Sequence, residues 1–308
     1  MLLRRMSSAA KEVVLRVGGV PEHFNTPWHT AINAGRFAAV GLRVEWTDFP
    51  GGTGAMTKAL RNNEIDVALA LTEGLVADLH KGNPSKLLGT YVSSPLTWGV
   101  HVSADSRRGS MKDLDGARYA VSRMGSGSHL MACVDAHERG VDPRRLAMEI
   151  VGSLDGARKA LGEGSADVFL WEKFTTKFMV DSGEWKRIGE VPTPWPCFTI
   201  AATDAILAKE GDALLSMLSV VRDEAKSLRA APDGPRTIGA MYSQHESDIV
   251  EWLEGVSWSA QPRVSHDTLT QVMRALVDAG VLAAEETMSP RELVSSLTTN
   301  ADPGADVV

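Results

Sequence analysis

The first two-thirds of the chain alternates short apolar runs with stretches of helical periodicity. Residues 66–71, Asp-Val-Ala-Leu-Ala-Leu, form a nearly continuous apolar run, which is typical of a parallel strand covered on both faces. Residues 42–48 alternate apolar and polar positions, as a half-buried strand does. A helix is expected before them, over residues 27–39, because Pro27 suits a first helical position and Gly41 follows as a stop. Strands separated by helices of this length predict right-handed βαβ units.

Two stretches of the chain share this pattern at an offset of 101 residues. Lys58-Ala-Leu60 corresponds to Lys159-Ala-Leu161, and Asp66-Val67 corresponds to Asp167-Val168. In both places a short polar turn leads from a helix into an apolar strand. The correspondence indicates two similar α/β lobes in tandem, although any two βαβ units share some of this pattern. The expected strands are residues 13–17, 42–48, 66–71, 87–92, 98–102, 117–121, 148–151 and 167–171.

After residue 201 the pattern changes to amphipathic helices with few strand candidates. Residues 203–229, 238–253 and 265–279 all show helical periodicity. A helical segment of this kind cannot bury its apolar faces alone. We therefore expect it to pack back onto a lobe, most simply the first.

Composition limits the classes of function. The chain is 44% hydrophobic and 23% charged, as soluble globular domains are. Its formal charge of -7 argues against broad binding to nucleic acids or anionic membranes. The sequence has no apolar run near the roughly 18–20 residues that cross a bilayer, so we expect no membrane span. Eight tryptophans against three tyrosines is an unusual ratio that calls for a reason.

Metal and catalytic motifs are absent from the sequence. Its two cysteines, Cys133 and Cys197, are too few for a disulfide framework or a cysteine-rich zinc site. The eight histidines show no metal-binding spacing, and neither His-Glu-x-x-His nor Gly-x-Ser-x-Gly occurs. We therefore expect no metal, no cofactor and no catalytic residue.

The two ends of the sequence bear on its compartment. The N-terminal residues contain no apolar segment of a secretory signal, which predicts a cytoplasmic protein. Arg4, Arg5 and the serines near them are also compatible with an organelle presequence, and export by a non-standard route stays open. Residues 301–308, with a proline, a glycine and small side chains, are expected to form a disordered tail.

Three segments carry a family resemblance. They are Gly51-Gly-Thr-Gly-Ala-Met56, Glu64-Ile-Asp-Val-Ala-Leu-Ala-Leu-Thr-Glu-Gly74 and Val121-Ser-Arg-Met-Gly-Ser-Gly-Ser-His-Leu-Met131. Together they resemble the type II periplasmic-binding-protein superfamily, and within it the branch of sulfonate, taurine, nitrate and thiamine-precursor binding proteins. More narrowly, the chain looks like a leaderless subgroup whose ligand is unassigned. The resemblance covers residues 13–205 well and the helical C-terminus loosely.

The resemblance implies an α/β, two-lobe Venus-flytrap fold with a ligand in the cleft. Each lobe would be a mixed, mostly parallel sheet with flanking helices. Lobe one would comprise residues 12–102 and 203–300, and lobe two residues 103–202. The chain would cross between the lobes near residues 100–103 and 199–203.

Two glycine-containing loops, each before a helix, are candidates for anion binding. Backbone N–H groups in such turns can point at an anion, and the helix dipole favours negative charge. In the family the two loops would face each other across the cleft from roughly equivalent places in the lobes. Tight turns with serine caps explain the same residues without a ligand. The candidates are Gly52, Thr53 and Gly54 in one loop, and Ser126, Gly127, Ser128 and the following His129 in the other.

Further candidates lie at the carboxyl ends of strands, where α/β proteins form clefts, and near the second crossing. A carboxylate there can bind a cationic or amidine-like group, and a tryptophan can stack on a planar ligand. Capping, dipole and core-packing roles explain these residues equally well. The candidates are His23, Asn25, Trp28, Thr72, Glu73, Trp171, Glu172 and Trp195.

We expect a binding protein for a small anionic or planar heteroaromatic molecule, similar to ABC-transporter substrate-binding proteins, with its transporter partner unspecified. The alternative is an enzyme on the same fold. A thiamine-pyrimidine synthase of this branch uses pyridoxal phosphate, a lysine, a histidine and a cysteine-rich motif; here Lys58 lies near a glycine-rich loop, but the cysteine cluster is absent. A desulfinase of this fold has its nucleophile in lobe one, whereas Cys133 and Cys197 fall in the second-lobe stretch. A regulatory domain without a ligand is the third interpretation.

Overall fold

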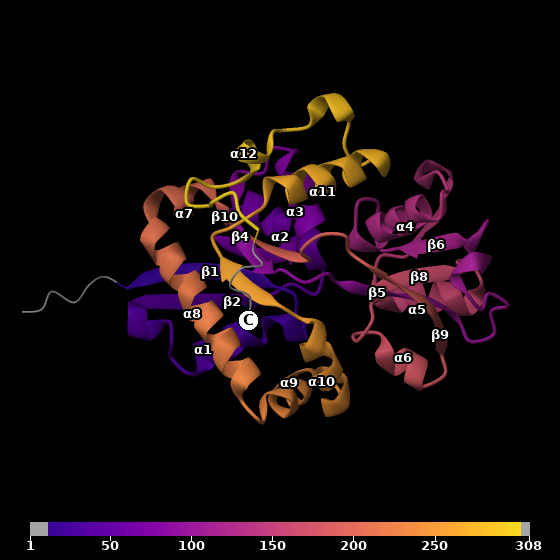
Figure 1. Ribbon diagram of the computed structural model, residues 1–308, viewed down its shortest axis with the longest axis horizontal. Helices are drawn as coiled ribbons and strands as arrows, with labels where there is room; N and C mark the ends of the chain where they lie inside the picture. The colour runs from indigo at the N-terminus through magenta and orange to yellow at the C-terminus, as the bar shows by residue number, and fades with distance from the viewer. Residues whose placement is uncertain (1–11, 303–308) are drawn as a thin grey trace, which may run out of the picture.

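The computed structural model describes residues 12–302, which form two α/β lobes and a C-terminal extension (Figure 1). Each lobe is built on its own sheet, with helices packed around it. The expected two-lobe α/β architecture is therefore confirmed. Both sheets are mixed as expected, but neither is mostly parallel, because β10 and β5, which follow the crossings, run antiparallel to their neighbours.

Lobe one contains a six-stranded sheet with the strand order β11-β4-β10-β3-β1-β2. The apolar run at 66–71 supplies β3 at the centre, and all but the last residue of this strand are buried. β1 pairs in parallel with β2 and β3, and β10 runs antiparallel to β3 and β4. The elements are β1 (Val13–Gly19), η1 (His23–Asn25), α1 (Thr26–Asn33), η2 (Ala38–Val40), β2 (Leu42–Asp48), α2 (Gly52–Arg61), β3 (Val67–Leu71), α3 (Thr72–Leu79), β4 (Ser85–Val92) and β10 (Phe198–Thr203).

Lobe two contains a five-stranded sheet with the order β7-β6-β8-β5-β9. β6 pairs in parallel with β7 and β8, and β5 runs antiparallel to β8 and β9. The elements are β5 (Thr97–Ser103), η3 (Met111–Leu114), β6 (Arg118–Val121), α4 (Gly127–Glu138), η4 (Pro143–Arg145), β7 (Ala147–Ile150), α5 (Leu154–Glu163), β8 (Val168–Glu172), α6 (Lys177–Asp181) and β9 (Trp185–Pro192).

The chain crosses between the lobes earlier than the sequence predicts. β5 pairs with β8 and β9, so residues 97–103 belong to the sheet of lobe two rather than to lobe one. On the return, β10 lies wholly in the sheet of lobe one. The crossings are therefore residues 93–96 and 193–197, several residues before the expected positions. Strand periodicity located β5, expected at residues 98–102, but could not tell which sheet this strand joins.

Equivalent hydrogen bonds in the two lobes, with acceptors 101 residues apart and donors 102 residues apart, support the correspondence between the lobes. In lobe one the backbone N–H of Arg16 donates to Asp66 Oδ2 over 2.9 Å. In lobe two the backbone N–H of Arg118 donates to Asp167 Oδ2 over 2.8 Å. Each aspartate directly precedes the apolar central strand, and each donor lies on the neighbouring parallel strand. The aspartates thus help to set the same strand register in both lobes.

The C-terminal extension returns to lobe one, as expected, and also reaches lobe two. The long helix α8 packs against α1, whereas α11 packs against both α3 of lobe one and α4 of lobe two. The expected helix over residues 238–253 is two helices, separated by Ser243 in the left-handed conformation (φ 55°). The extension comprises α7 (Asp204–Lys209), α8 (Gly211–Ala230), α9 (Gly234–Tyr242), α10 (Glu246–Gly255), β11 (Trp258–Gln261), α11 (His266–Asp278), η5 (Ala284–Glu286) and α12 (Pro290–Leu293).

Aromatic side chains hold the short turn η1 in place. The carbonyl oxygen of Phe24 accepts hydrogen bonds from Tyr91 Oη (2.6 Å) and Trp258 Nε1 (3.0 Å), both of them buried. Trp252 packs edge-on against both Phe24 and Trp258. Part of the tryptophan excess therefore serves the core of lobe one, where it fixes the backbone next to His23.

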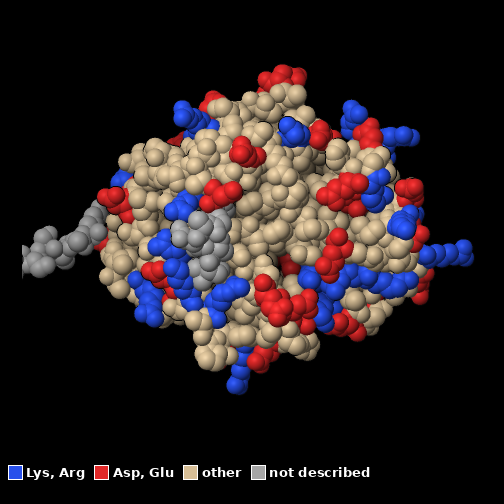
Figure 2. Space-filling model, viewed as in Figure 1, with Lys and Arg blue, Asp and Glu red and all other residues tan. Residues whose placement is uncertain are grey.

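Acidic and basic side chains are interspersed over the face drawn in Figure 2. None of the helices in the described part of the chain is long and apolar enough to cross a membrane. The predicted disordered tail falls mostly on residues 303–308, outside the described residues.

Candidate functional site

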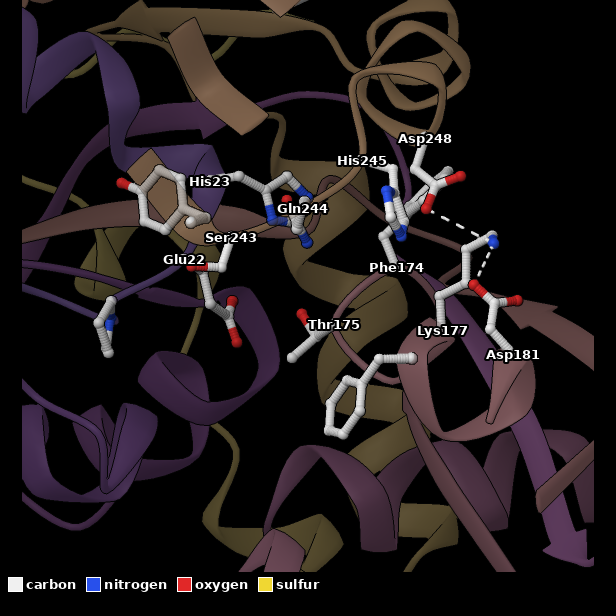
Figure 3. Close-up of a pocket in the computed structure, with 13 residues that line it drawn as sticks. Glu22, His23, Phe174, Thr175, Lys177, Asp181, Ser243, Gln244, His245 and Asp248 are labelled. Atoms are coloured by element: carbon white, nitrogen blue, oxygen red, sulfur yellow. Dashed lines mark hydrogen bonds and ion pairs between the residues drawn. The ribbon is translucent and has the colours of Figure 1, made fainter. Parts of the chain in front are cut away.

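A cavity of about 310 Å³ lies between the two lobes (Figure 3). Lobe one contributes the turn from β1 into η1, and lobe two contributes the loop from β8 into α6. The C-terminal extension contributes the turn between α9 and α10. Because both lobes line the cavity, its shape depends on their relative position. The walls include Glu22, His23, Phe174, Thr175, Lys177, Tyr242, Gln244 and Asp248.

Three residues of the cavity wall carry buried polar atoms without protein partners in the described part of the chain. Nε2 of His23 and Oε1 of Gln244 are buried, and neither makes a hydrogen bond within residues 12–302. The hydroxyl of Tyr242 lies near that of Thr26, but the two do not meet the geometric criteria for a hydrogen bond. Buried polar atoms are nearly always paired, because an unpaired one costs about 1–3 kcal/mol. These unpaired atoms belong to residues of the cavity wall, so the wall lacks polar partners that a ligand or ordered water could supply.

The two ionisable groups beside β1 are shifted toward their neutral forms. Glu22 makes no ion pair with any described residue, and burial together with the nearby Glu172 carboxylate raises its pKa to about 8. His23 is only 1% exposed, and burial lowers its pKa to about 3. Its ring packs edge-on against Trp252, with the ring centroids 4.3 Å apart. The imidazole is therefore neutral and contributes no positive charge to the cavity.

Two lysines of lobe two form ion pairs across the cleft. Lys177, at the edge of the cavity, lies 2.6 Å from Asp181 on its own helix and 3.5 Å from Asp248 on α10 (Figure 3). Lys173 lies 3.1 Å from Glu251, one helical turn further along α10. These contacts connect lobe two to the C-terminal extension, and they leave the charge of Lys177 already neutralised.

The first glycine loop lies against an arginine of the other lobe. Gly52 takes a positive φ of 65°, and the hydroxyl of Thr53 accepts a hydrogen bond from the backbone N–H of Leu71 (3.2 Å). A Cβ atom added to Gly54 would lie 2.5 Å from the guanidinium of Arg123. A cation from lobe two thus covers the loop for which anion binding was predicted, and that role stays a prediction.

The second loop is held by hydrogen bonds within lobe two. The hydroxyls of Ser126 and Ser128 lie 3.0 Å apart, and Ser128 Oγ also accepts from the backbone N–H of Ser122. Nδ1 of His129 accepts from the backbone N–H of Gly125 over 3.1 Å. These polar groups therefore cap and close the start of α4.

Gly127, in the same loop, allows close packing between the lobes. A Cβ atom at this position would lie 2.6 Å from the ring of Trp98 and 2.9 Å from a methyl group of Leu71 in lobe one. The two glycine loops are not equivalent in topology, contrary to the expectation from sequence. Residues 125–128 follow β6, whose counterpart in lobe one is β1, so their equivalent is the segment 22–25 at the cavity.

The candidates after β3 contact the second crossing. The hydroxyl of Thr72 donates to the carbonyl oxygen of Pro196 over 2.6 Å. Trp195 Nε1 donates to Glu73 Oε2 over 2.9 Å, while Oε1 of this 1%-exposed glutamate has no partner within residues 12–302. Burial raises the pKa of Glu73 to about 7. Thr72, Glu73 and Trp195 thus join lobe one to the crossing segment rather than lining the main cavity.

The candidates after β8 shape the wall of the cavity. Glu172 Oε2 accepts hydrogen bonds from the backbone N–H and the hydroxyl of Thr175, at 2.6 and 2.8 Å. These bonds fix the loop that carries Phe174 and Thr175. Trp171 stacks on Phe169, with the ring centroids 5.4 Å apart. Glu172 therefore acts on the cavity indirectly, through Thr175.

Two candidates near η1 have structural contacts. Nδ2 of Asn25 donates to the carbonyl oxygen of Val20 over 2.7 Å. Trp28 is fully buried, stacks on Phe37 and meets Tyr91 edge-on, so it lies in the core of lobe one. Of the candidates named from the sequence, only His23 is among the residues that line the cavity. Their roles in ligand binding stay predictions.

The sequence analysis missed the wall that comes from residues 242–248. This turn falls inside a stretch with unbroken helical periodicity, and the break at Ser243 carries no glycine or proline to announce it. Phe174 and Thr175 were missed as well, because they follow Glu172 in a loop without a motif. A short polar run, Tyr242-Ser-Gln-His245, was the only signal in the sequence.

Both cysteines are buried, and neither is prepared as a nucleophile. Burial raises the pKa of Cys133 to about 12 and that of Cys197 well above its usual value. His129 Nε2 lies 3.7 Å from Cys133 Sγ, but burial also lowers the pKa of this histidine. The described residues contain no group of three side chains able to hold a metal ion.

Comparisons with known proteins agree with this architecture. Residues 98–191 match the family described as the Ca3427-like PBP. The structure of the Candida albicans CA3427 gene product, described as having the generic periplasmic-binding-protein fold, superposes with a TM-score of 0.84 and 28% identity over 95% of this chain and 99% of that chain. No curated protein sequence matches.

Two further solved structures share the fold at lower identity. The alkanesulfonate-binding protein SsuA from Xanthomonas axonopodis pv. citri, bound to MOPS, gives a TM-score of 0.77 at 14% identity, covering 92% of this chain and 98% of that chain. The nitrate-binding protein NrtA from Synechocystis PCC 6803 gives 0.69 at 13% identity, covering 92% and 87%. The two lobes, the double crossing and these likenesses lead to one conclusion: the chain has the type II periplasmic-binding-protein fold.

Proposed function

We propose that the protein binds a small molecule in the cavity between its lobes, which close around the ligand. The observation that carries this proposal is a cavity lined from both lobes, whose wall residues His23 and Gln244 each keep a buried polar atom without a partner within residues 12–302. Ligand sites combine a mostly apolar concave wall with a few polar groups that fix orientation. A ligand that pairs with these atoms would recover free energy that the empty protein lacks.

Of the two ligand classes expected from the sequence, a planar heteroaromatic molecule suits this cavity better than an anion. Phe174 and Tyr242 supply aromatic surface on opposite sides of the cleft. Glu22, whose pKa is raised to about 8, supplies no positive charge, and Lys177, the only lysine or arginine in the wall as described, is already paired with two aspartates. The ring of a heteroaromatic molecule can stack while its nitrogens meet the polar atoms.

Solved relatives support the general role. SsuA and NrtA are described as sulfonate- and nitrate-binding proteins, and a Staphylococcus aureus relative as the ligand-binding component of an import system. Each shares less than 25% identity with this chain, so the likeness extends to the fold and not to the ligand. Delivery of the bound molecule to a transporter is the corresponding part of the proposal.

The test compares Gln244→Leu with Asn25→Leu. Wild type is first screened by thermal shift against pyrimidines, other heteroaromatics, sulfonates, nitrate and carboxylates. Gln244→Leu removes an amide oxygen that has no partner, so we expect the free protein to keep or gain stability while the ligand-induced shift is lost. Asn25→Leu removes an amide that is already bonded, so we expect lower stability instead.

Two results would overturn the proposal. One is that no compound class shifts the melting temperature of folded wild type. The other is that Gln244→Leu binds the active compound as tightly as wild type does.

A further inference from the structure

The cavity wall contains a carboxyl group without a protein partner among the described residues. The carboxylate of Glu22 and the amide oxygen of Gln244 are both acceptors, and neither has a side-chain partner within residues 12–302. Neutral His23 can offer one N–H at most. Lys177, the only lysine or arginine in the cavity wall as described, is already paired with Asp181 and Asp248. A ligand that donates hydrogen bonds to Glu22 would supply the partner that this carboxyl group lacks.

The balance of charges around the cavity favours a ligand with positive charge. Glu22 faces the negative Glu172 and has no cation beside it, which together with burial raises its pKa. Asp181 and Asp248 add two negative charges at the rim against the single positive charge of Lys177. The cavity is thus negative whenever Glu22 is ionised, and an added cation would offset that charge.

The requirement for a ligand also rests on a second observation. His23 is 1% exposed, lines the cavity and leaves Nε2 without a partner (Figure 3). A carboxylate at the surface of a cleft would be satisfied by water alone. A buried imidazole nitrogen beside it is costly unless something in the cavity pairs with it.

We propose that the cavity selects a planar cation of the amidine or guanidine class, whose N–H groups donate to the carboxylate of Glu22. This inference rests on the proposed function, because it names the ligand class of the same cavity. A planar fork of N–H groups matches a carboxylate better than a single ammonium does. The aromatic rings of Phe174, Phe178 and Tyr242 also line the cavity, and aromatic faces attract cations.

Three probes of nearly equal shape separate charge from shape. Benzamidine is a planar cation, benzamide is neutral, and benzoate is an anion. We expect calorimetric titration of wild type at about pH 9, above the pKa of about 8 of Glu22, to rank them in that order, with benzamidine at least about tenfold tighter than benzamide, as a charge-assisted hydrogen bond implies. Benzoate should give no measurable heat.

Variants locate the charge effect. Glu22→Gln keeps the shape of the side chain and removes its charge, so benzamidine should bind about tenfold or more weakly while benzamide changes by less than about threefold. Glu286→Gln, at an exposed position on η5, is the matched control and should bind all three probes as wild type does. Circular dichroism establishes that each variant is folded.

The outcomes distinguish this inference from the proposed function. Equal binding of benzamidine by wild type and Glu22→Gln, or tighter binding of benzoate than of benzamidine, overturns the choice of a cation. If no probe binds but a sulfonate or carboxylate shifts the melting temperature in the screen above, the choice of a cation fails and the proposed function stands. If no compound of any class binds, both fail.

Discussion

The guanidinium of Arg123 in lobe two lies directly against Gly54, at the start of α2 in lobe one. A Cβ atom on residue 54 would come within 2.5 Å of the guanidinium carbon. Burial lowers the pKa of Arg123, so keeping its guanidinium charged in the cleft costs free energy. The missing side chain at Gly54 thus allows the two lobes to approach each other at this point.

Gly54→Ala should weaken closure of the lobes. The added methyl group meets the end of a flexible side chain, so Arg123 can move aside, and we expect a penalty of about 1 kcal/mol on the closed form rather than loss of the fold. Small-angle X-ray scattering should show a larger radius of gyration than wild type.

Two further variants control this experiment. Gly54→Ala combined with Arg123→Ala should restore the wild-type radius of gyration, because the clash is gone. Gly109→Ala adds a methyl group into open space and should change nothing. An unchanged radius of gyration for Gly54→Ala alone would contradict the idea that this contact limits closure.

The ion pair between Lys177 and Asp248 should contribute to closure in a salt-dependent way. Asp248→Asn removes the pair across the cleft and leaves Lys177 bound to Asp181, so lobe two should keep its stability. A partly exposed pair is worth up to about 1 kcal/mol, which corresponds to about a fivefold change in the ratio of closed to open protein. Scattering at low and high salt measures this ratio.

Asp181→Asn is the matched control for the ion pair between Lys177 and Asp248. It removes the pair within lobe two and leaves the pair across the cleft, so closure should persist. Raising the salt concentration should open wild type toward the state of Asp248→Asn, because ions screen exposed charges. Equal salt responses of wild type and Asp248→Asn would count against a role of this ion pair in closure.

Replacing either of two glycines in α5 by alanine should change the free energy of unfolding, but in opposite directions. A methyl group on Gly156 would overlap the carbonyl oxygen of Val151, a backbone atom that cannot move cheaply, so we expect a loss of about 2 kcal/mol or more. A methyl group on Gly162 meets open space, and the better helix propensity of alanine should add about 0.5–1 kcal/mol. Urea unfolding measures both changes, and the same sign for the two variants would refute the assignment.

The sequence predicted the lobes well because their central strands carry strong local signals. The apolar runs at β3 and β8 can belong only to covered strands, and Asp66 and Asp167 mark the start of each. The sequence assigned β5 to the wrong lobe and placed the first crossing several residues too late. The sheet that β5 joins depends on its pairing with β8, about 70 residues later in the chain. Strand pairing over such distances leaves no trace in periodicity.

The cavity was less predictable than the fold. His23 could be named because it follows β1, where α/β proteins place their sites. Gln244 lies more than 200 residues later and reaches the same cavity only through the return of the extension to lobe one. Trp28 shows the opposite case, since its position after β1 favoured a ligand role while its burial among Phe37 and Tyr91 places it in the core.

Glu73 should make stability fall as pH rises. Its pKa is raised by burial from 4.5 to about 7, so the folded protein holds the proton more tightly than the unfolded chain. The stabilising contribution is complete below about pH 4.5 and is lost as pH rises through about 7, a change of about 3 kcal/mol. Glu73→Gln keeps an acceptor for Trp195 Nε1 without the charge, so it should exceed wild type in stability at pH 8 and vary less between pH 5 and 8.

Urea unfolding across this range measures the difference, with the exposed Glu286→Gln as control. Parallel pH profiles for Glu73→Gln and wild type would mean that Glu73 is not the titrating group at the crossing.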